Sequence, residues 1–290
     1  MVKGVRYIIT GSSSSKIKKI IKRGRAGSMV RIISTLLFTA FLLYGNPAFA
    51  AKAVKAAGPT ITAASIPSFF TGTFGTATTT NITYIPNYIK YKIDDISLKL
   101  TIPFIIVQSN GVALSGGQVI GTGKGASKTE GGLGDIWLEG KYTLHHVLDT
   151  PFDFVPYTKI KFGTASRVKG LGTGENDYEA GMGIRTRFAS RWFPFARVGY
   201  RFVGQPVGRV LDDILTYRAG ASYAMDRTNV LTVLFSGRQA SQPGFASAAE
   251  IIAAWNYKIQ PSLGLQVFGD KGLSNGSPDY GVGGGLTYRF

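Results

Sequence analysis

The 290-residue chain contains no cysteine and only two histidines. Without cysteine, neither a disulfide framework nor a thiolate metal site can form. After residue 50 there is also no apolar run of the roughly 20 residues that a membrane-spanning helix needs. A mature chain that enters a membrane must therefore cross it as strands.

Acidic residues are missing from the first 50 positions, which hold nine of the 33 Lys and Arg. The formal charge of +17 invites comparison with nucleic-acid-binding proteins, but the remainder carries 24 bases against 16 acids. Those bases are spread along the chain without a basic run. Because nucleic-acid recognition uses a concentrated basic patch, we expect no nucleic-acid partner.

The first 50 residues have the layout of a leader followed by a secretory signal. Arg31 precedes a short apolar block at residues 32–44, and Ala48, Phe49 and Ala50 form an Ala-x-Ala cleavage site. We predict a true start at Met29, cleavage after Ala50, and an upstream extension or disordered leader before Met29. The alternative is a single membrane-anchoring helix, for which the block is short.

The C-terminal stretch alternates strictly between two kinds of residue. One face of a strand would carry aromatic and aliphatic residues with one glycine: Tyr280, Val282, Gly284, Leu286, Tyr288 and Phe290. The other face would carry Gly281, Gly283, Gly285, Thr287 and Arg289. This pattern suits a strand with hydrocarbon outside and a polar, crowded interior. The ending resembles the C-terminal targeting strand of bacterial outer-membrane barrels.

The same alternation recurs in segments of about ten residues from residue 96 onward, although the faces of residues 82–91 cannot be assigned. Short and long connections alternate along the chain, as they do in outer-membrane barrels. We predict an all-β chain: a flexible segment at residues 51–59, then a single transmembrane antiparallel β-barrel of about 12 strands at residues 60–290. The first strand is expected within residues 60–75; the alternative is that residues 61–70 plug the lumen.

Three stretches resemble the outer-membrane family named for the MetA pathway of phenol degradation. They are Gly-Leu-Gly-Asp-Ile at residues 132–136 with Gly-Lys-Tyr at 140–142, the hairpin at residues 160–178, and the hairpin at residues 84–103. Phe162 and Gly163 stand where that family is expected to have Leu-Pro. The resemblance covers most of residues 80–190 and implies a transporter-like barrel, proposed to pass small aromatic or other hydrophobic compounds.

No candidate catalytic, cofactor or metal site emerges from the motifs. The glycine runs at residues 121–125 and 170–174 lack the strand and helix that a phosphate-binding loop requires, so we interpret them as external loops. His145 and His146 lie at an expected periplasmic turn, away from any serine at the outer leaflet. Asp212 and Asp213 are interpreted as solvated loop residues. We expect no enzymatic activity, cofactor or metal.

Charged residues gather on the face expected to line the lumen, with cations outnumbering acids two to one. The cations are Lys99, Lys141, Lys159, Lys161, Arg185, Arg187, Arg197, Arg201, Arg218, Arg238, Lys258 and Arg289. The acids are Asp135, Glu139, Asp153, Glu179, Glu250 and Asp270. Most could pair across strands and stiffen the wall, since an unpaired buried charge is costly. The surplus would still favour anions.

Two functions follow from this pattern. The first is a passive transporter in the outer membrane of a Gram-negative bacterium, passing small aromatic or amphiphilic solutes and tolerating a carboxylate. The second is a structural or adhesion barrel whose lumen is plugged by the loop at residues 109–132 or by the segment before Phe70. In either case the expected partners are outer-membrane lipid and, through Phe290, the barrel assembly machinery.

Overall fold

The computed structural model describes residues 58–121 and 125–290. The predicted start at Met29, the signal sequence with its cleavage after Ala50, and all but the last two residues of the segment 51–59 lie outside the described residues. No helix in the described part of the chain is long and apolar enough to cross a membrane.

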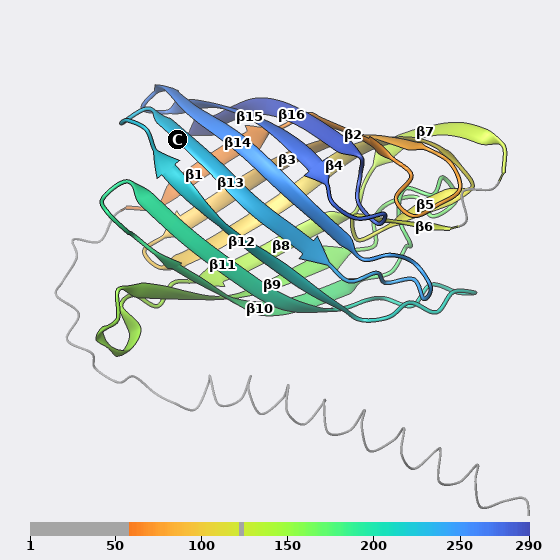
Figure 1. Ribbon diagram of the computed structural model, residues 1–290, viewed down its shortest axis with the longest axis horizontal. Helices are drawn as coiled ribbons and strands as arrows, with labels where there is room; N and C mark the ends of the chain where they lie inside the picture. Colours follow the sequence, from red (N-terminus) through yellow and green to blue (C-terminus); the bar gives the residue numbers. More distant parts are fainter. Residues whose placement is uncertain (1–57, 122–124) are drawn as a thin grey trace, which may run out of the picture. The chain divides into compact units, whose positions relative to one another are not determined.

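Nearly all described secondary structure is antiparallel β-sheet (Figure 1). The sixteen strands are β1 (Thr60–Ser65), β2 (Ser68–Gly72), β3 (Thr80–Ile93), β4 (Ile96–Asn110), β5 (Val112–Ser115), β6 (Gln118–Gly121), β7 (Ser127–Leu133), β8 (Ile136–Tyr142), β9 (Phe152–Phe162), β10 (Asp177–Thr186), β11 (Trp192–Phe202), β12 (Ile214–Ala224), β13 (Asn229–Arg238), β14 (Ala248–Gln260), β15 (Leu263–Gly272) and β16 (Tyr280–Arg289). One short 3-10 turn, η1 (Val147–Asp149), lies between β8 and β9.

Fourteen of these strands form one sheet that closes on itself, because both β1 and β2 pair with β16. β1 and β2 share one place in the wall, between β16 and β3, and β7 and β8 share another, beside β4. The result is a closed 12-stranded antiparallel barrel, and the predicted fold class and strand number are confirmed.

The first wall strand is interrupted at Ile66 and Pro67. Proline has no N–H to give to a ladder, so it breaks the strand without opening the wall. The ladder continues through the break, since the Pro67 carbonyl accepts a hydrogen bond from the Gly284 N–H at 3.0 Å and the Ile66 N–H donates to Pro86 at 3.3 Å. A first strand within residues 60–75 is therefore present, and the alternative that residues 61–70 plug the lumen is wrong.

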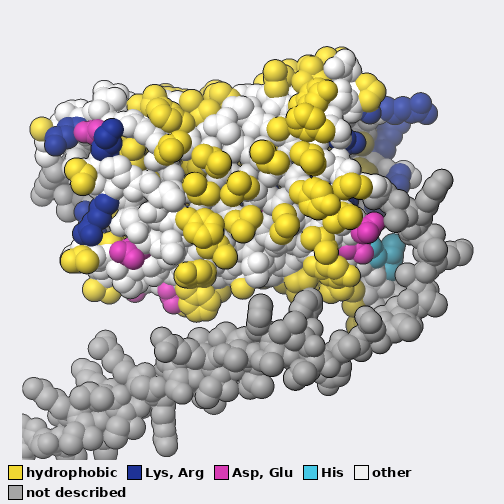
Figure 2. Space-filling model, turned by 180° about the vertical axis from the view of Figure 1, so that it is seen from behind, with side chains coloured by type: hydrophobic (Ala, Val, Ile, Leu, Met, Phe, Trp, Pro, Cys, Tyr) yellow, Lys and Arg dark blue, Asp and Glu magenta, His cyan; other side chains and the backbone are white. Residues whose placement is uncertain are grey.

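The alternation of side chains decides which face meets lipid. In β4, Ile96, Leu98, Leu100, Ile102 and Phe104 are exposed on the outer face, whereas Thr101, Pro103, Ile105 and Val107 are buried inside. Figure 2 shows the same on the barrel wall, where hydrophobic side chains cover the middle and Lys and Arg gather at the two ends. This is the distribution that a hydrocarbon surround selects.

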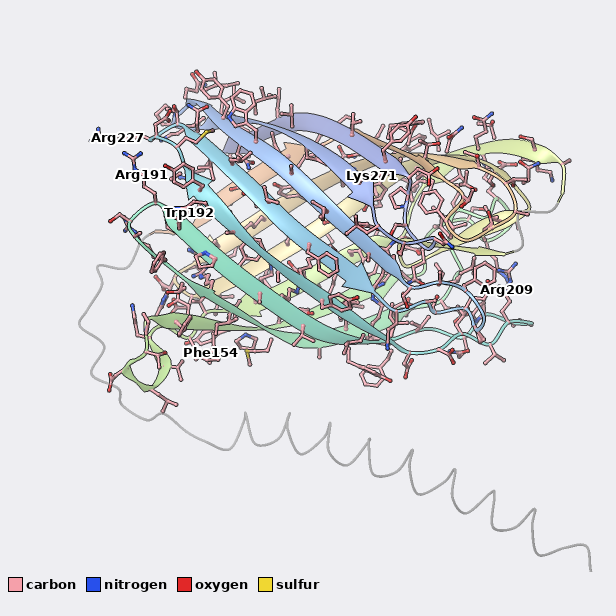
Figure 3. The ribbon with its side chains drawn as sticks, in the orientation of Figure 1. Phe154, Arg191, Trp192, Arg209, Arg227 and Lys271 are labelled. Atoms are coloured by element: carbon pink, nitrogen blue, oxygen red, sulfur yellow. The ribbon has the colours of Figure 1, made fainter. Side chains whose placement is uncertain are left out.

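The two ends of the barrel differ in their connections. At one end, which we call the short-turn end, the turns span residues 94–95, 143–151, 187–191, 225–228 and 261–262. At the other, the loop end, the connections span residues 73–79, 111–126, 163–176, 203–213, 239–247 and 273–279. Figure 3 places Arg191, Trp192 and Arg227 at the short-turn end and Arg209 at the loop end. The predicted alternation of short and long connections is confirmed.

Aromatic pairs lie on the outer face near the rims. Trp192 packs on Tyr223 with ring centroids 4.7 Å apart, and Tyr288 meets Phe290 edge-on at 4.9 Å, both near the short-turn end. Tyr200 and Phe202 form another pair at 5.1 Å toward the loop end. Rings at these levels match the aromatic girdles that sit at the two membrane interfaces of such barrels.

The loop end is filled by a small apolar core inside the barrel. Its buried members come from the wall and from three connections: Phe74, Ile105, Val107, Leu114, Val119, Ala165 and Leu171. Phe70, Ile82, Tyr84 and Val112 pack against them. The barrel interior is therefore divided along its length. The apolar part lies at the loop end, and the charged part described next lies on its short-turn side.

Candidate functional site: the barrel lumen

A cavity of about 590 Å³ occupies the lumen below the apolar core. Twelve of the eighteen charged residues predicted to line the lumen border it: Lys99, Asp135, Glu139, Lys141, Lys159, Glu179, Arg197, Arg201, Arg218, Arg238, Glu250 and Asp270. The other six lie elsewhere, and one of them, Asp153, is described below with His145 and Arg185. Lys161 is enclosed within the wall, Arg185, Lys258 and Arg289 stand near the ends of their strands at the short-turn end, and Arg187 lies in the turn after β10.

A ladder of charged residues crosses the wall from β4 to β11. Each faces the next on the neighbouring strand, in the order Lys99, Glu139, Lys159, Glu179 and Arg201. Alternating charge in directly opposed positions is a favourable cross-strand arrangement. The side chains nevertheless do not all pair with their direct neighbours, because other cations compete for the two carboxylates.

Glu139 gathers three cations from three strands. Its carboxylate lies 2.8 Å from Lys141, 2.9 Å from Arg197 and 3.9 Å from Lys99. One carboxylate is thus surrounded by three positive charges and can neutralise only one of them. The cluster has positive charge to spare at the cavity surface.

Glu179 holds the second cluster together with Tyr157. Its carboxylate accepts hydrogen bonds from Arg201 at 2.9 Å and from the Tyr157 hydroxyl at 2.9 Å, and Arg197 lies 3.6 Å away. The Arg197 guanidinium also covers the Tyr157 ring at 3.4 Å from its centroid. The ring lies over Gly181 and Gly199, where a β-carbon would collide with it. These two glycines make room for an aromatic ring inside a narrow barrel.

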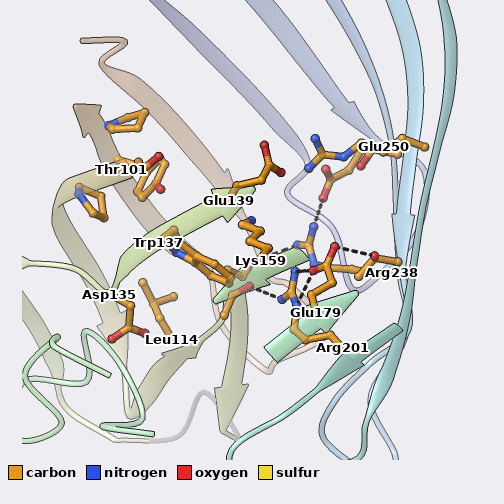
Figure 4. Close-up of a pocket in the computed structure, with 18 of the residues that line it drawn as sticks. Thr101, Leu114, Asp135, Trp137, Glu139, Lys159, Glu179, Arg201, Arg238 and Glu250 are labelled. Atoms are coloured by element: carbon orange, nitrogen blue, oxygen red, sulfur yellow. Dashed lines mark hydrogen bonds and ion pairs between the residues drawn. The ribbon is translucent and has the colours of Figure 1, made fainter. Parts of the chain in front are cut away.

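Two of the cations that border the cavity have no acidic partner among the described residues. Lys159 stands between Glu139 and Glu179 in register, yet neither carboxylate lies within ion-pair distance of it. Its ammonium instead lies 3.8 Å from the centroid of the Trp137 ring. Arg218, opposite Arg197 on the neighbouring strand, has neither an ion pair nor a hydrogen bond within the described ranges. Figure 4 shows Trp137, Lys159, Glu179 and Arg201 gathered at the cavity.

The acids and cations differ in how far they are exposed to the lumen. The side chains of Lys99 and Lys141 are 37% and 35% exposed, whereas those of Glu139 and Glu179 are 6% and 5% exposed. The carboxylates therefore lie behind Lys99 and Lys141, whereas Arg201, at 8%, is buried together with Glu179. A solute in the cavity meets a surface that is more positive than the count of charges alone would suggest.

Lys161 has a different role from its lumen-facing neighbours. It is fully buried between Asp177 at 3.0 Å and Asp135 at 3.5 Å, and it donates to the Thr173 hydroxyl at 3.3 Å. Asp135 in turn accepts the Ala165 N–H at 3.0 Å. This cluster fixes the loop at residues 163–176 to the wall.

Another cluster lies on β13 to β15, where Arg238 pairs with Glu250 at 3.3 Å. Asp270 is buried nearby, and its Oδ1 atom has no hydrogen-bond partner in the described part of the chain. Asp153, predicted to face the lumen, lies at the short-turn end, where it meets His145 at 3.0 Å and Arg185 at 3.1 Å.

The loop at residues 111–126 turns into the barrel as a hairpin made of β5 and β6. Its tip carbonyls, on Gly116 and Gly117, accept hydrogen bonds from Arg201 at 2.8 Å and Arg238 at 3.2 Å. Gln118 donates to the Gln239 carbonyl at 2.6 Å and accepts from Ser241 N–H and hydroxyl at 3.0 and 2.7 Å. The tip borders the cavity at the loop end, so the hairpin narrows the passage there.

Several lining residues were not singled out from the sequence. Trp137 and Tyr157 share the parity of the charged residues, which places them inside, but nothing in the pattern shows that cations cover their rings. Phe70, Tyr84 and Phe268 line the opposite, apolar side of the cavity. The face on which Tyr84 lies could have been assigned only by knowing that the lumen is partly apolar.

Metal and catalytic chemistry find little support in the geometry. Within residues 58–121 and 125–290 no three His, Asp or Glu side chains are grouped in a way that could hold a metal ion. His145 bridges Asp95 at 2.8 Å and Asp153 at 3.0 Å at the short-turn end. Asp213 accepts the Val203 N–H at 2.9 Å and orders its own loop.

Comparison with known proteins gives structural likeness only. No family model and no curated protein sequence matches the chain. An outer membrane channel from Pseudomonas putida F1 superposes with a TM-score of 0.61 at 13% identity, over 85% of this chain and 99% of that one. The KdgM porin gives 0.50 at 8% identity over 79% and 99%, and the NanC porin 0.50 at 10% over 78% and 98%. The chain thus has the fold of the outer-membrane β-barrels.

Proposed function

We propose that the chain is a passive channel in the outer membrane of a Gram-negative bacterium, for small aromatic or other hydrophobic compounds, with anions favoured over cations. The placing of cations in front of buried carboxylates carries this proposal. It gives the lumen a positive surface, and such a surface attracts anions and repels cations in a narrow pore.

The nature of the solute is supported by the cavity wall opposite the charges and by the family resemblance. Phe70, Tyr84 and Phe268 offer an apolar surface in the same cavity. The sequence resemblance to the family of the MetA pathway of phenol degradation points to the same class of compound. Together they favour an amphiphilic passage over a purely aqueous one.

A second function, a structural or adhesion barrel with a closed lumen, is favoured by one observation. The β5–β6 hairpin enters the lumen at the loop end and is bonded to Arg201, Arg238 and Ser241. A hairpin that never moved would close the passage.

Reconstitution into liposomes separates the two functions. We expect to measure single-channel conductance. In a KCl gradient, the sign of the reversal potential should show that chloride passes more readily than potassium. Lys99→Glu, which reverses a half-exposed lumen charge, should reduce that preference, while Lys128→Glu on the exposed part of β7 should leave it unchanged. The channel function would be excluded if neither the complete protein nor a variant lacking residues 112–121 showed any conductance or solute uptake.

We also assign outer-membrane lipid as the surround of the apolar wall, and the barrel assembly machinery as the partner of the C-terminal strand. The exposed Phe290 side chain supports the second assignment.

A further inference from the structure

The cavity contains an excess of positive charge that the protein itself leaves unbalanced. Around Glu139 and Glu179 stand six cations: Lys99, Lys141, Lys159, Arg197, Arg201 and Arg218. Four of them are within ion-pair distance of the two carboxylates. Lys159 and Arg218 are not.

Neither cation is fully buried, since Lys159 is half-buried and Arg218 is exposed, so both are accessible to an anion that enters the lumen. Lys159 is only partly compensated by the face of Trp137, since a cation–π contact is weaker than an ion pair. Arg218 lacks even that contact in the described structure, and its planar fork of donors suits a carboxylate. Lys159 and Arg218 are therefore both free to bind an anion in the cavity.

The other residues that line the cavity indicate which chemical group the anion must have besides its charged group. Trp137 lies between the cationic wall and the apolar surface that includes Leu114, as Figure 4 shows. Phe70 and Phe268, whose ring centroids are 6.4 Å apart, line the same cavity. A flat apolar body beside a single carboxylate matches this division, and at about 590 Å³ the cavity falls within the usual range for small-molecule sites.

We propose that Lys159 and Arg218 form the recognition site for the carboxylate of a small aromatic acid, whose ring lies against Trp137 and the apolar wall. This deepens the proposed channel function and rests on it for the transport step. The carboxylate takes the place of the missing counter-ion, and the ring takes up the apolar side of the cavity. Neutral aromatics lack the first interaction, and inorganic anions lack the second.

The test compares benzoate with its neutral isostere benzamide in liposomes containing the complete protein. We expect benzoate uptake to exceed benzamide uptake by about tenfold, as one desolvated charge interaction allows. The double variant Lys159→Gln with Arg218→Gln should bring the two rates together. The matched control, Lys128→Gln with Arg227→Gln, removes two exposed charges outside the cavity and should keep the difference. Equal uptake of the two probes by the unaltered protein, or a difference that survives the first double variant, would overturn the proposal.

Binding is measured separately from transport. In a Trp192→Phe, Trp255→Phe background only Trp137 among residues 58–121 and 125–290 reports on the cavity, and we expect benzoate to quench its fluorescence more strongly than acetate or benzamide. Quenching by benzoate without uptake of any solute would support the recognition site while contradicting the channel. Uptake without benzoate-specific quenching would contradict the site and leave the channel in place.

Discussion

At the scale of single residues, burial separates two kinds of lumen lysine. Lys141 pairs with Glu139 while remaining partly exposed, whereas Lys161 is enclosed between two aspartates. The sequence places both on the inward face by parity alone. It could not show which would be buried, because that depends on the register that sets Lys161 opposite Asp177 and on the loop that covers it.

Lys161→Met tests this distinction. The change leaves Asp135 and Asp177 buried without their cation, and breaking a buried pair in this way costs about 3–5 kcal/mol. We expect the free energy of unfolding in urea, measured in detergent micelles, to fall by that amount. Lys141→Met, the control, should cost under about 1 kcal/mol. Equal stability of the two variants would show that the Lys161 cluster does not hold the loop at residues 163–176.

Residues 82–91 show why some faces could not be predicted. Ile85, Ile89 and Tyr91 point outward opposite β4, but Ile82, Tyr84 and Tyr88 are equally apolar and lie inside. The usual rule that polar residues mark the lumen fails here, since this part of the lumen is itself apolar. As a consequence Lys90, which lies on the inward face, was not among the predicted lumen residues.

At the scale of elements, the wall strands were predictable because their two-residue period is local and repeats. The β5–β6 hairpin was not, because its position depends on contacts with residues more than a hundred positions away, such as Gln118 with Ser241. The sequence showed only a long connection at residues 109–132. The inward direction of this connection follows only from the structure of the closed barrel.

Replacement of residues 112–121 by a flexible Gly-Ser linker tests the part that the hairpin plays. Removing a segment that narrows the lumen should increase single-channel conductance. Gln118→Ala, which removes three hydrogen bonds to Gln239 and Ser241, should increase it less and add fluctuations between conductance levels. A linker of matched composition at residues 206–210, which do not border the cavity, is the control. Unchanged conductance in both hairpin variants would mean that the passage is limited elsewhere.

At the scale of the whole molecule, the C-terminal residue ends the strand that closes the barrel. The Phe290 N–H donates to the Ile61 carbonyl at 3.0 Å, and the residue is 74% exposed. Because the ring contributes little burial, its loss should hardly affect a barrel that has already closed. The ring remains free for recognition before insertion.

Phe290→Ala should therefore lower the amount of barrel assembled in the outer membrane of cells, measured by heat-modifiable migration, while refolding of purified protein into detergent proceeds as before. Phe162→Ala, which removes an exposed ring at the far end of β9, is the control for simple loss of lipid contact. Equal cellular yields of the two variants would remove the role assigned to the terminal ring.

The cations in front of the lumen carboxylates have a consequence for the habitat in which such a barrel can discriminate between solutes. Their effect on a passing solute acts through space, and mobile ions shorten its reach from about 10 Å at 0.1 M salt to about 3 Å at 1 M. In dilute fresh water or soil moisture the whole cross-section of the lumen would feel the charged wall. In brine the charged wall would act only on solutes in contact with it. Selectivity would then depend on the shape of the solute more than on its charge.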